Sequence, residues 1–153
     1  MIDCFDGEFR FLSNMFPLPT KIKVVYDGTD SICRNGCLEV DNTEAAYQAG
    51  KVEDVSIFEG LTGMQSKRKS HKIVMSVEDF TRWNHELKFK LMERLLRMKF
   101  SIPELKEMLL STGDEELVEG NYWHDTCWGV CEGVGENHLG KLLMKIREEL
   151  KQS

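Results

Sequence analysis

Long apolar runs, repeats and linkers are all lacking in this sequence of 153 residues. No window approaches the roughly 18 apolar residues of a membrane-spanning helix, so no membrane partner is expected. The first ten residues, MIDCFDGEFR, do not have the profile of a secretion signal, and we therefore expect a cytoplasmic location. Without a linker, a chain of this length is expected to form one domain over residues 1–153.

An excess of positive charge is also lacking. The 26 acidic residues outnumber the 20 basic ones, and the formal net charge is −6. This balance argues against a protein that binds nucleic acid mainly through its overall charge, although it allows a local basic patch.

The sequence has five cysteines, and an odd count without an export signal is typical of reduced thiols. Cys33 with Cys37 and Cys127 with Cys131 could supply four thiolates to zinc, but zinc ribbons normally use the tighter C-x2-C spacing. Cys127 and Cys131 also fit the inward face of a strand, where cysteine behaves as a small hydrophobe. We therefore predict no metal site and no cofactor.

Strands are predicted mainly in the first third of the chain. Residues 21–26 alternate and are rich in β-forming side chains, which predicts the first strand of a hairpin, and residues 31–40 form a second hairpin candidate. Each carries a hairpin turn signal, Asp27-Gly28 and Asn35-Gly36 respectively. Further short strands are predicted at 115–119 and 126–131.

Helices are predicted for most of the remaining chain. One begins near residue 41, because Asp41 followed by Glu44 fits an N-terminal capping box. A long helix after Ser76 shows apolar residues at three- and four-residue spacing, which predicts one buried face made of Phe80, Trp83, Leu87, Leu91, Leu95 and Met98. Other helices are expected at 54–62 (ending near Gly63), at 101–113, and at the C-terminus with a stripe of Leu139, Leu142, Leu143, Ile146 and Leu150.

These elements predict an α+β fold, with a single helix-rich domain and a small, mostly antiparallel sheet. The strand–helix alternation of a doubly wound fold is lacking.

A glycine-rich stretch follows residue 125. Residues 135–141, GENHLGK, match the spacing of a phosphate-binding loop, but Leu142 stands where a Ser or Thr must hold magnesium. An ordinary glycine loop that enters a helix is therefore the favoured interpretation. The backbone N–H groups near Asn137 to Gly140 are still expected to open this helix, and helix N-termini attract anions.

Several polar side chains are candidates for a site. The basic run at 67–72, KRKSHK, is usually a solvated face, but Arg68 has the fork geometry that suits a substrate phosphate. Glu44 is explained structurally by its place in a capping box, and Trp83 by its place on the apolar helix face. Asp125 lies among aromatic residues where neither helix nor strand requires an acid, an arrangement that suits a flat polar ligand such as a nucleobase.

Four segments in the same order resemble the YbiA-like family, also called the NADAR domain. They are FDGEFRFLSNMFP at the N-terminus, TEAAYQAGK, RWN with KFKLMERLLRMKF, and the long C-terminal LVEGNYWHDTCWGVCEGVGENHLGK. The resemblance implies a YbiA-like fold and an N-glycosidase that cleaves a bond to ribose. It implies either phosphorylated ribosylaminouracil intermediates of riboflavin synthesis or ADP-ribosyl-guanine in nucleic acid as the substrate, so nucleic acid is expected only as a modified substrate.

The same resemblance implies roles for individual residues. Glu44, Trp83, Asp125 and Trp128 fall on the family's catalytic positions. Motif positions that shape the pocket are Asn14, Gln48, Lys51 and Asn137, and Gly129 belongs to the signature beside Trp128, where glycine lets the backbone approach a ligand. The sequence departs from the family pattern at Ala45, Lys67 and Cys131, which leaves the acids and tryptophans intact.

Elementary chemistry agrees with these roles. Departure of the base leaves positive charge on the sugar carbon, which a carboxylate stabilises, and glycosidases use two carboxylates for the same task. A tryptophan can stack on the flat base. Lys51 allows a second route, an imine with an opened ribose, although a solvent-exposed lysine at a helix C-terminus is the simpler interpretation. A non-catalytic module that binds ADP-ribose or NAD is the alternative to an enzyme.

Overall fold

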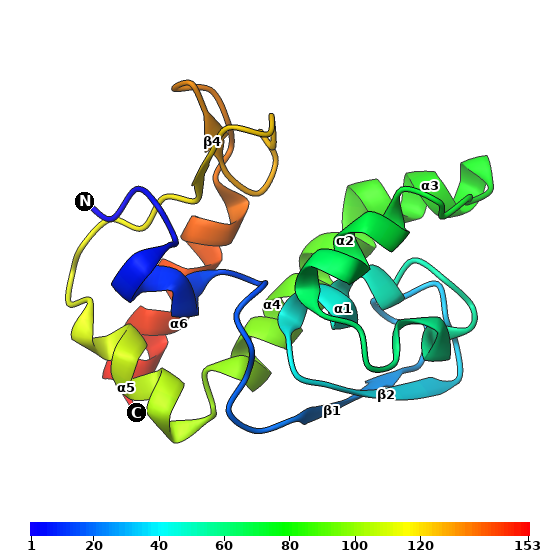
Figure 1. The fold of residues 1–153 in the computed structure, drawn as a ribbon, viewed down its shortest axis with the longest axis horizontal. Coiled ribbons are helices and arrows are strands. Elements are labelled where there is room, and N and C mark those ends of the chain that lie inside the picture. Colours follow the sequence, from blue (N-terminus) through cyan, green and yellow to red (C-terminus); the bar gives the residue numbers. More distant parts are fainter. The chain divides into compact units, whose positions relative to one another are not determined.

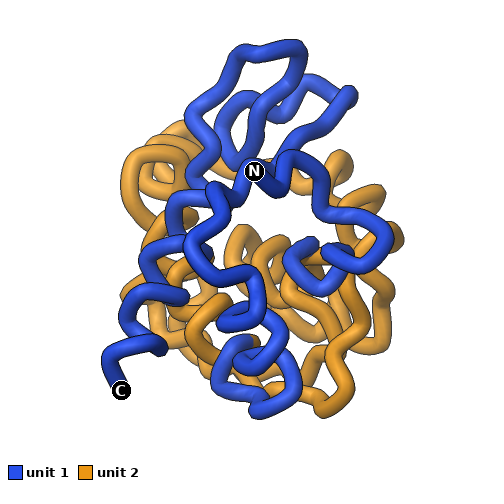
Figure 2. The backbone as a smooth tube through the Cα atoms, turned by 90° about the vertical axis from the view of Figure 1, so that its left-hand side faces the viewer, with its two compact units in different colours: residues 1–13, 100–153 blue, residues 14–99 orange.

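A computed structural model describes residues 1–153, and the chain forms two compact units (Figure 2). Unit 1 combines residues 1–13 with residues 100–153, and unit 2 comprises residues 14–99. Unit 2 is thus inserted in the sequence of unit 1. The prediction that residues 1–153 form one domain stays a prediction.

Unit 2 begins with a single β-hairpin (Figure 1). Strand β1 (Ile22–Tyr26) pairs antiparallel with β2 (Gly36–Val40), and Val24 opposite Leu38 faces the core. The prediction of two separate hairpins is therefore wrong. The Asn35-Gly36 signal fails because Gly36 already pairs with Tyr26, so that residues 27–35 together form the connection.

Helix α1 (Thr43–Ala49) is capped by Asn42, whose Oδ1 accepts a hydrogen bond from the Ala45 N–H at 2.8 Å. The predicted Asp41 cap is therefore wrong, and Glu44 takes no part in a capping box. The short 3-10 helix η2 (Val55–Phe58) ends well before Gly63, which instead opens helix α2 (Gly63–Ser70) behind a Thr62 cap. The expectation that Gly63 ends a helix is wrong, because the Thr62–Gln65 capping box starts one there.

The long helical stretch after Ser76 is confirmed. It runs through α3 (Val77–Arg82), a π-helical turn η3 (Trp83–Leu87) and α4 (Lys88–Lys99). Its predicted buried face is confirmed for Trp83, Leu87, Leu91 and Leu95, which are all at most 3% exposed. Phe80 is 56% exposed, so the face begins at Trp83 and not at Phe80.

Unit 1 is built around two helices. Helix α5 (Pro103–Ser111) packs on α6 (His138–Lys151) and on the 3-10 helix η1 (Gly7–Leu12). Leu139, Leu143 and Ile146 are buried, which confirms these members of the predicted stripe, whereas Leu142 and Leu150 are half-buried. The predicted strands at 115–119 and 126–131 are displaced and shorter, because only β3 (Gly120–Asn121) and β4 (Val130–Cys131) form a ladder, in parallel. Within 115–119, Leu117 makes an isolated bridge to Ile2.

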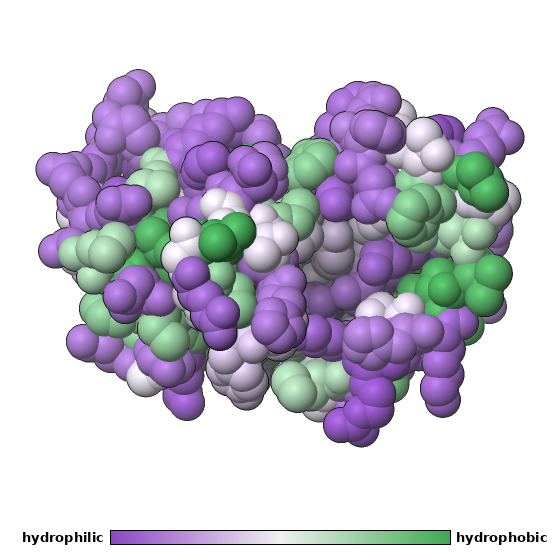
Figure 3. All heavy atoms as spheres, turned by 90° about the horizontal axis from the view of Figure 1, so that it is seen from above, coloured by the Kyte–Doolittle hydropathy of each residue, from purple (hydrophilic) through white to green (hydrophobic).

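The α+β fold class is confirmed. Helices dominate, and the longer of the two small sheets is antiparallel. No helix is long and apolar enough to cross a membrane. On the face drawn in Figure 3, hydrophobic residues form small groups among hydrophilic ones, which is ordinary for a surface in water.

Candidate active site

A buried acid and amide lie on one face of α1 in unit 2. Glu44 and Gln48 are one helical turn apart and are 8% and 5% exposed. The Gln48 Nε2 donates to Glu44 Oε1 at 2.8 Å, which fixes both side chains. The Gln48 Oε1 is buried and has no hydrogen-bond partner in the protein. Since a buried unpaired acceptor is costly, this amide oxygen suits a donor group on a ligand.

An aromatic pair and a lysine adjoin this acid. The rings of Tyr47 and Trp83 lie 5.3 Å apart at 49°. The Lys51 Nζ lies 5.7 Å from the Tyr47 ring and 5.9 Å from the Trp83 ring. Burial lowers the pKa of Lys51, the Glu44 charge raises it, and the Lys88 charge lowers it. A neutral amine, which is the nucleophilic form, is therefore easier to reach at Lys51 than at an ordinary lysine.

Close packing of α1 on the π-helical turn and α4 holds this cluster together. A methyl group at Gly50 would overlap the Leu91 side chain and would lie 3.1 Å from the Trp83 ring. Gly50 has an ordinary helical φ of −63°, so space and not backbone freedom requires glycine here. The π-turn that begins at Trp83 is of a kind often found at functional sites.

Asn14 reaches the same helix from the start of unit 2. Its backbone carbonyl accepts the Glu44 N–H at 3.0 Å, and its Nδ2 donates to Met92 Sδ at 3.6 Å. The Asn14 Oδ1 is buried without a hydrogen-bond partner, like the Gln48 Oε1. The structure thus brings Asn14, Gln48 and Lys51 next to Glu44, and Trp83 next to Lys51 and Tyr47.

Asp125 shapes a tight loop in unit 1. Its Oδ1 accepts the N–H groups of Cys127 at 3.1 Å and Trp128 at 2.9 Å. Asn121 brackets the residue, since its Oδ1 accepts the Asp125 N–H and its Nδ2 donates to the Asp125 carbonyl. The loop therefore does require an acceptor at residue 125, contrary to the expectation that no structural element needs it. The second carboxylate oxygen makes no hydrogen bond in the protein and is available to a ligand.

Trp128 is half-buried at the start of α6. Its ring lies edge-on to His138 with centroids 6.3 Å apart. The carbonyls of Cys127, Trp128 and Gly129 accept the N–H groups of His138, Leu139 and Asn137. The expectation that N–H groups here attract an anion is therefore wrong for these three, because loop carbonyls already occupy them.

Asn137 and Gly129 support this loop. The Asn137 side chain accepts the Glu119 N–H and donates to the Leu117 carbonyl, both at 3.0 Å. A methyl group at Gly129 would overlap the Glu119 carbonyl and side chain. Both residues thus join the loop to the segment at residues 117–119. Their contact with substrate stays a prediction.

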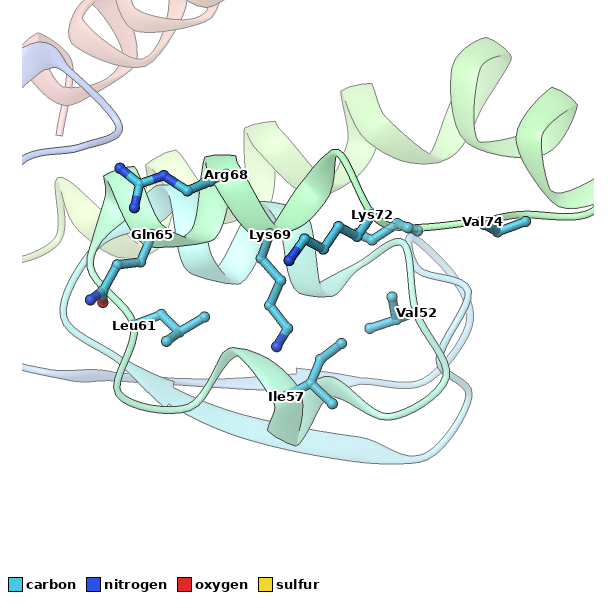
Figure 4. A pocket seen from close by; sticks show the side chains of 9 residues that line it. Val52, Ile57, Leu61, Gln65, Arg68, Lys69, Lys72 and Val74 are labelled. Atoms are coloured by element: carbon cyan, nitrogen blue, oxygen red, sulfur yellow. The ribbon is translucent and has the colours of Figure 1, made fainter.

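Arg68 lies apart from these residues. It is exposed on α2 and lines a pocket with Lys69, Lys72 and Gln65 (Figure 4). None of the residues around Glu44 described above lines this pocket. All five cysteines are free thiols, and no three metal-ligating side chains gather at one point. The absence of bound zinc stays a prediction.

Sequence reasoning did not find three residues that organise these sites. Tyr47 contacts Trp83, Asn42 caps α1, and Asn121 brackets Asp125. The signal for Tyr47 was its place three residues after Glu44 on the same helix. The prediction that Glu44 and Asp125 line one pocket stays a prediction, since they belong to different units.

Comparison with known proteins gives concordant matches. A family model described as the NADAR domain matches residues 5–151. The chain is 32% identical over 150 residues to a riboflavin biosynthesis protein of Vibrio vulnificus, covering 96% of this chain but 37% of that protein. It is 34% identical over 111 residues to the N-glycosidase YbiA of Escherichia coli, covering 71% of this chain and 69% of YbiA. The NMR structure of Escherichia coli YbiA matches with a TM-score of 0.70 at 25% identity, over 99% of this chain and 88% of that one.

Proposed function

Because this chain belongs to the NADAR domain family, we propose that it is an N-glycosidase that cleaves the bond between a ribosyl carbon and a nitrogen. The observation that supports this most is the buried Glu44, hydrogen-bonded to Gln48 and adjoined by Trp83 and Lys51. A carboxylate held away from water attracts a sugar cation more strongly than an exposed one, because little water screens its charge.

In the water route, the C–N bond breaks and its electron pair stays on the nitrogen. Glu44 stabilises the positive charge on the sugar carbon and accepts a proton from the attacking water. The leaving nitrogen must gain a proton, and the family resemblance gives this step to Asp125, through its second carboxylate oxygen; solvent then carries the proton on Glu44 back to Asp125. The same resemblance gives Trp128 and Trp83 the task of presenting aromatic surface to the flat base. Proton transfer by a positioned side chain typically raises the rate by about 10²–10⁴-fold.

In the imine route, the Lys51 amine acts instead of water. It adds to the first carbon of the opened ribose and displaces the exocyclic amine of the base, which leaves as a free amine. Water then hydrolyses the resulting lysine imine, releasing the sugar aldehyde and restoring the amine. The lowered pKa of Lys51 supports this branch.

The proposed substrate is a phosphorylated ribosylaminouracil intermediate of riboflavin synthesis. Relatives named riboflavin biosynthesis proteins support it, although the chain spans only 37% of the Vibrio protein. The net charge of −6 favours a free small molecule over nucleic acid. ADP-ribosyl-guanine is the second candidate, because the family resemblance includes it.

The proposal is tested by parallel incubation of purified protein with ribosylaminouracil phosphate, NAD, ADP-ribose and ADP-ribosylated guanosine. Chromatography follows release of the free base or ribosyl product. We expect release from ribosylaminouracil phosphate. Binding of ADP-ribose or NAD with no product from any of the four would support a non-catalytic module instead.

A further inference from the structure

Unit 2 contains a pocket that is separate from the cluster around Glu44. It lies between α2, η2 and the segments that flank them, and its volume is about 630 Å³ (Figure 4). Pockets that hold small molecules commonly have volumes of roughly 300–1,000 Å³. None of its lining residues belongs to the cluster around Glu44, so it is a distinct pocket, and it is open to solvent.

The inner surface of this pocket is aliphatic. Val52, Ile57, Leu61, Ile73 and Val74 come from the chain before, within and after η2 and α2. Val74 is 94% exposed and Ile57 39% exposed, so apolar area that a ligand could cover faces water. No aromatic ring lines the pocket, which argues against stacking of a base and for an aliphatic body.

The rim of the pocket is cationic. In Figure 4, Lys69 extends from α2 towards Ile57 and Lys72 reaches over the same space, whereas Arg68 points away from Ile57. Neither Lys69 nor Lys72 makes an ion pair with an acid of the protein, and no acidic side chain lines the pocket. Two uncompensated ammonium groups above an aliphatic surface, in a chain of net charge −6, favour an anion.

We propose that this pocket binds a small amphiphilic anion, with a phosphate or carboxylate head between Lys69 and Lys72 and an aliphatic body against Ile57, Leu61 and Val52. The head gains charge-assisted hydrogen bonds, and the body removes exposed aliphatic surface from water. The anionic head and the aliphatic body each contact only part of the pocket, so a ligand that carries both binds more tightly than a ligand with one of them.

The test is a titration of the full chain, labelled with ¹⁵N, followed by the backbone amide signals. Octyl phosphate is compared with inorganic phosphate, which lacks the tail, and with 1-octanol, which lacks the charge. We expect octyl phosphate to shift amides of residues 52–74 and to bind at least about tenfold more tightly than either half. Equal affinity for octyl phosphate and inorganic phosphate would overturn the proposal, as would shifts centred on Glu44 and Trp83.

Variants separate a specific site from general attraction. The double variant Lys69→Gln/Lys72→Gln is expected to weaken octyl phosphate by about tenfold. The matched control Lys21→Gln/Lys23→Gln removes the same charge from exposed positions at β1, outside the pocket, and should leave affinity unchanged. Ile57→Asn should also weaken octyl phosphate but not inorganic phosphate. An equal loss in the control double variant would overturn the proposal.

Amide spectra of all variants report whether each remains folded. The measurement needs no turnover, so failure of the glycosidase proposal would leave this result unaffected, and failure here would leave the glycosidase assay unaffected.

Discussion

Glu44 is a buried acid on a helix that another residue caps. Because Asn42 caps the helix N-terminus, capping does not explain why Glu44 is buried there. In Glu44→Gln, the new amide can still accept from Gln48, so we expect little change in the free energy of unfolding. Turnover should fall by about 10²-fold or more, because the negative charge facing the sugar is lost. Urea unfolding and turnover, measured on the same preparation, check the expected stability and the expected loss of activity.

Asn42→Ala is the matched control, and it should show the opposite pattern. Loss of the cap should lower the free energy of unfolding by about 1 kcal/mol, with turnover per folded molecule near that of the parent.

Asp125→Asn tests the second acid. Asparagine can still accept the N–H groups of Cys127 and Trp128 but lacks the charge, so turnover should fall while the loop stays formed. Near-parental turnover in both Glu44→Gln and Asp125→Asn would refute the two-acid mechanism.

Lys51 distinguishes the two chemical routes. Burial lowers the pKa of Lys51, so its neutral amine forms at a lower pH than that of an exposed lysine. If the imine forms, turnover should rise with pH through this lowered pKa and then level off, because only the neutral amine attacks. Borohydride added during turnover should trap the sugar on the protein, as mass spectrometry would detect. An untrapped protein and an active Lys51→Arg variant would favour water.

At the scale of elements, Gly50 sets how closely α1 approaches the turn at Trp83 and α4. Gly50→Ala should lower the free energy of unfolding by about 1–3 kcal/mol, because the new methyl group overlaps Leu91. Leu91→Val removes the overlapping carbon. In a double-mutant cycle followed by urea unfolding, Gly50→Ala should therefore be less destabilising in the Leu91→Val background. Strict additivity would show that the overlap is not the cause.

Asn137 joins α6 to the segment at Leu117–Glu119 and has a left-handed backbone, with φ 54°. Asn137→Gly keeps the backbone freedom but loses two hydrogen bonds, so we expect a loss of about 1–3 kcal/mol in the free energy of unfolding. Asn137→Ala should lose about 1–2 kcal/mol more, because alanine disfavours that φ. Thermal or urea unfolding gives the order, and an alanine variant more stable than the glycine variant would contradict this explanation.

At the scale of the whole molecule, Lys99 couples stability to pH. Burial lowers the pKa of Lys99 to about 7, whereas an unfolded lysine has a pKa of about 10.4. Between these values the unfolded chain binds the proton more often, so this residue makes the free energy of unfolding rise with pH from about 7 to about 10. Below about pH 7 both states are protonated and the slope vanishes.

Lys99→Met should remove this contribution. The measurement is urea unfolding at pH 7 and pH 9 for both proteins, because every other titrating group is common to both. We expect the parent to gain more stability than Lys99→Met between the two pH values. An identical gain in both proteins would exclude Lys99 as its source.

Local patterns in the sequence were enough to predict the helix-rich α+β class, the long helix after Ser76 with its buried Trp83–Leu95 face, the helix at Pro103, and the family. These follow from periodic side chains and from ordered motifs, which are properties of the chain alone. The sequence also identified Glu44 and Asp125 as the acids to test, although for Glu44 it offered a capping role that the structure excludes.

Which of two neighbouring residues caps α1 depends on long-range contacts. Asp41 and Asn42 are both good caps, and the choice depends on where the chain leaves β2 and on the Asn42 contact with the Leu61 carbonyl. The same holds for the hairpin, since Gly36 joins a ladder with a strand ten residues away and so cannot form its own turn. The placement of Lys51 beside the Trp83 ring combines segments 32 residues apart, and the aliphatic pocket below Lys69 is assembled from residues before, between and after η2 and α2. Such contacts depend on long-range packing, which local patterns do not encode.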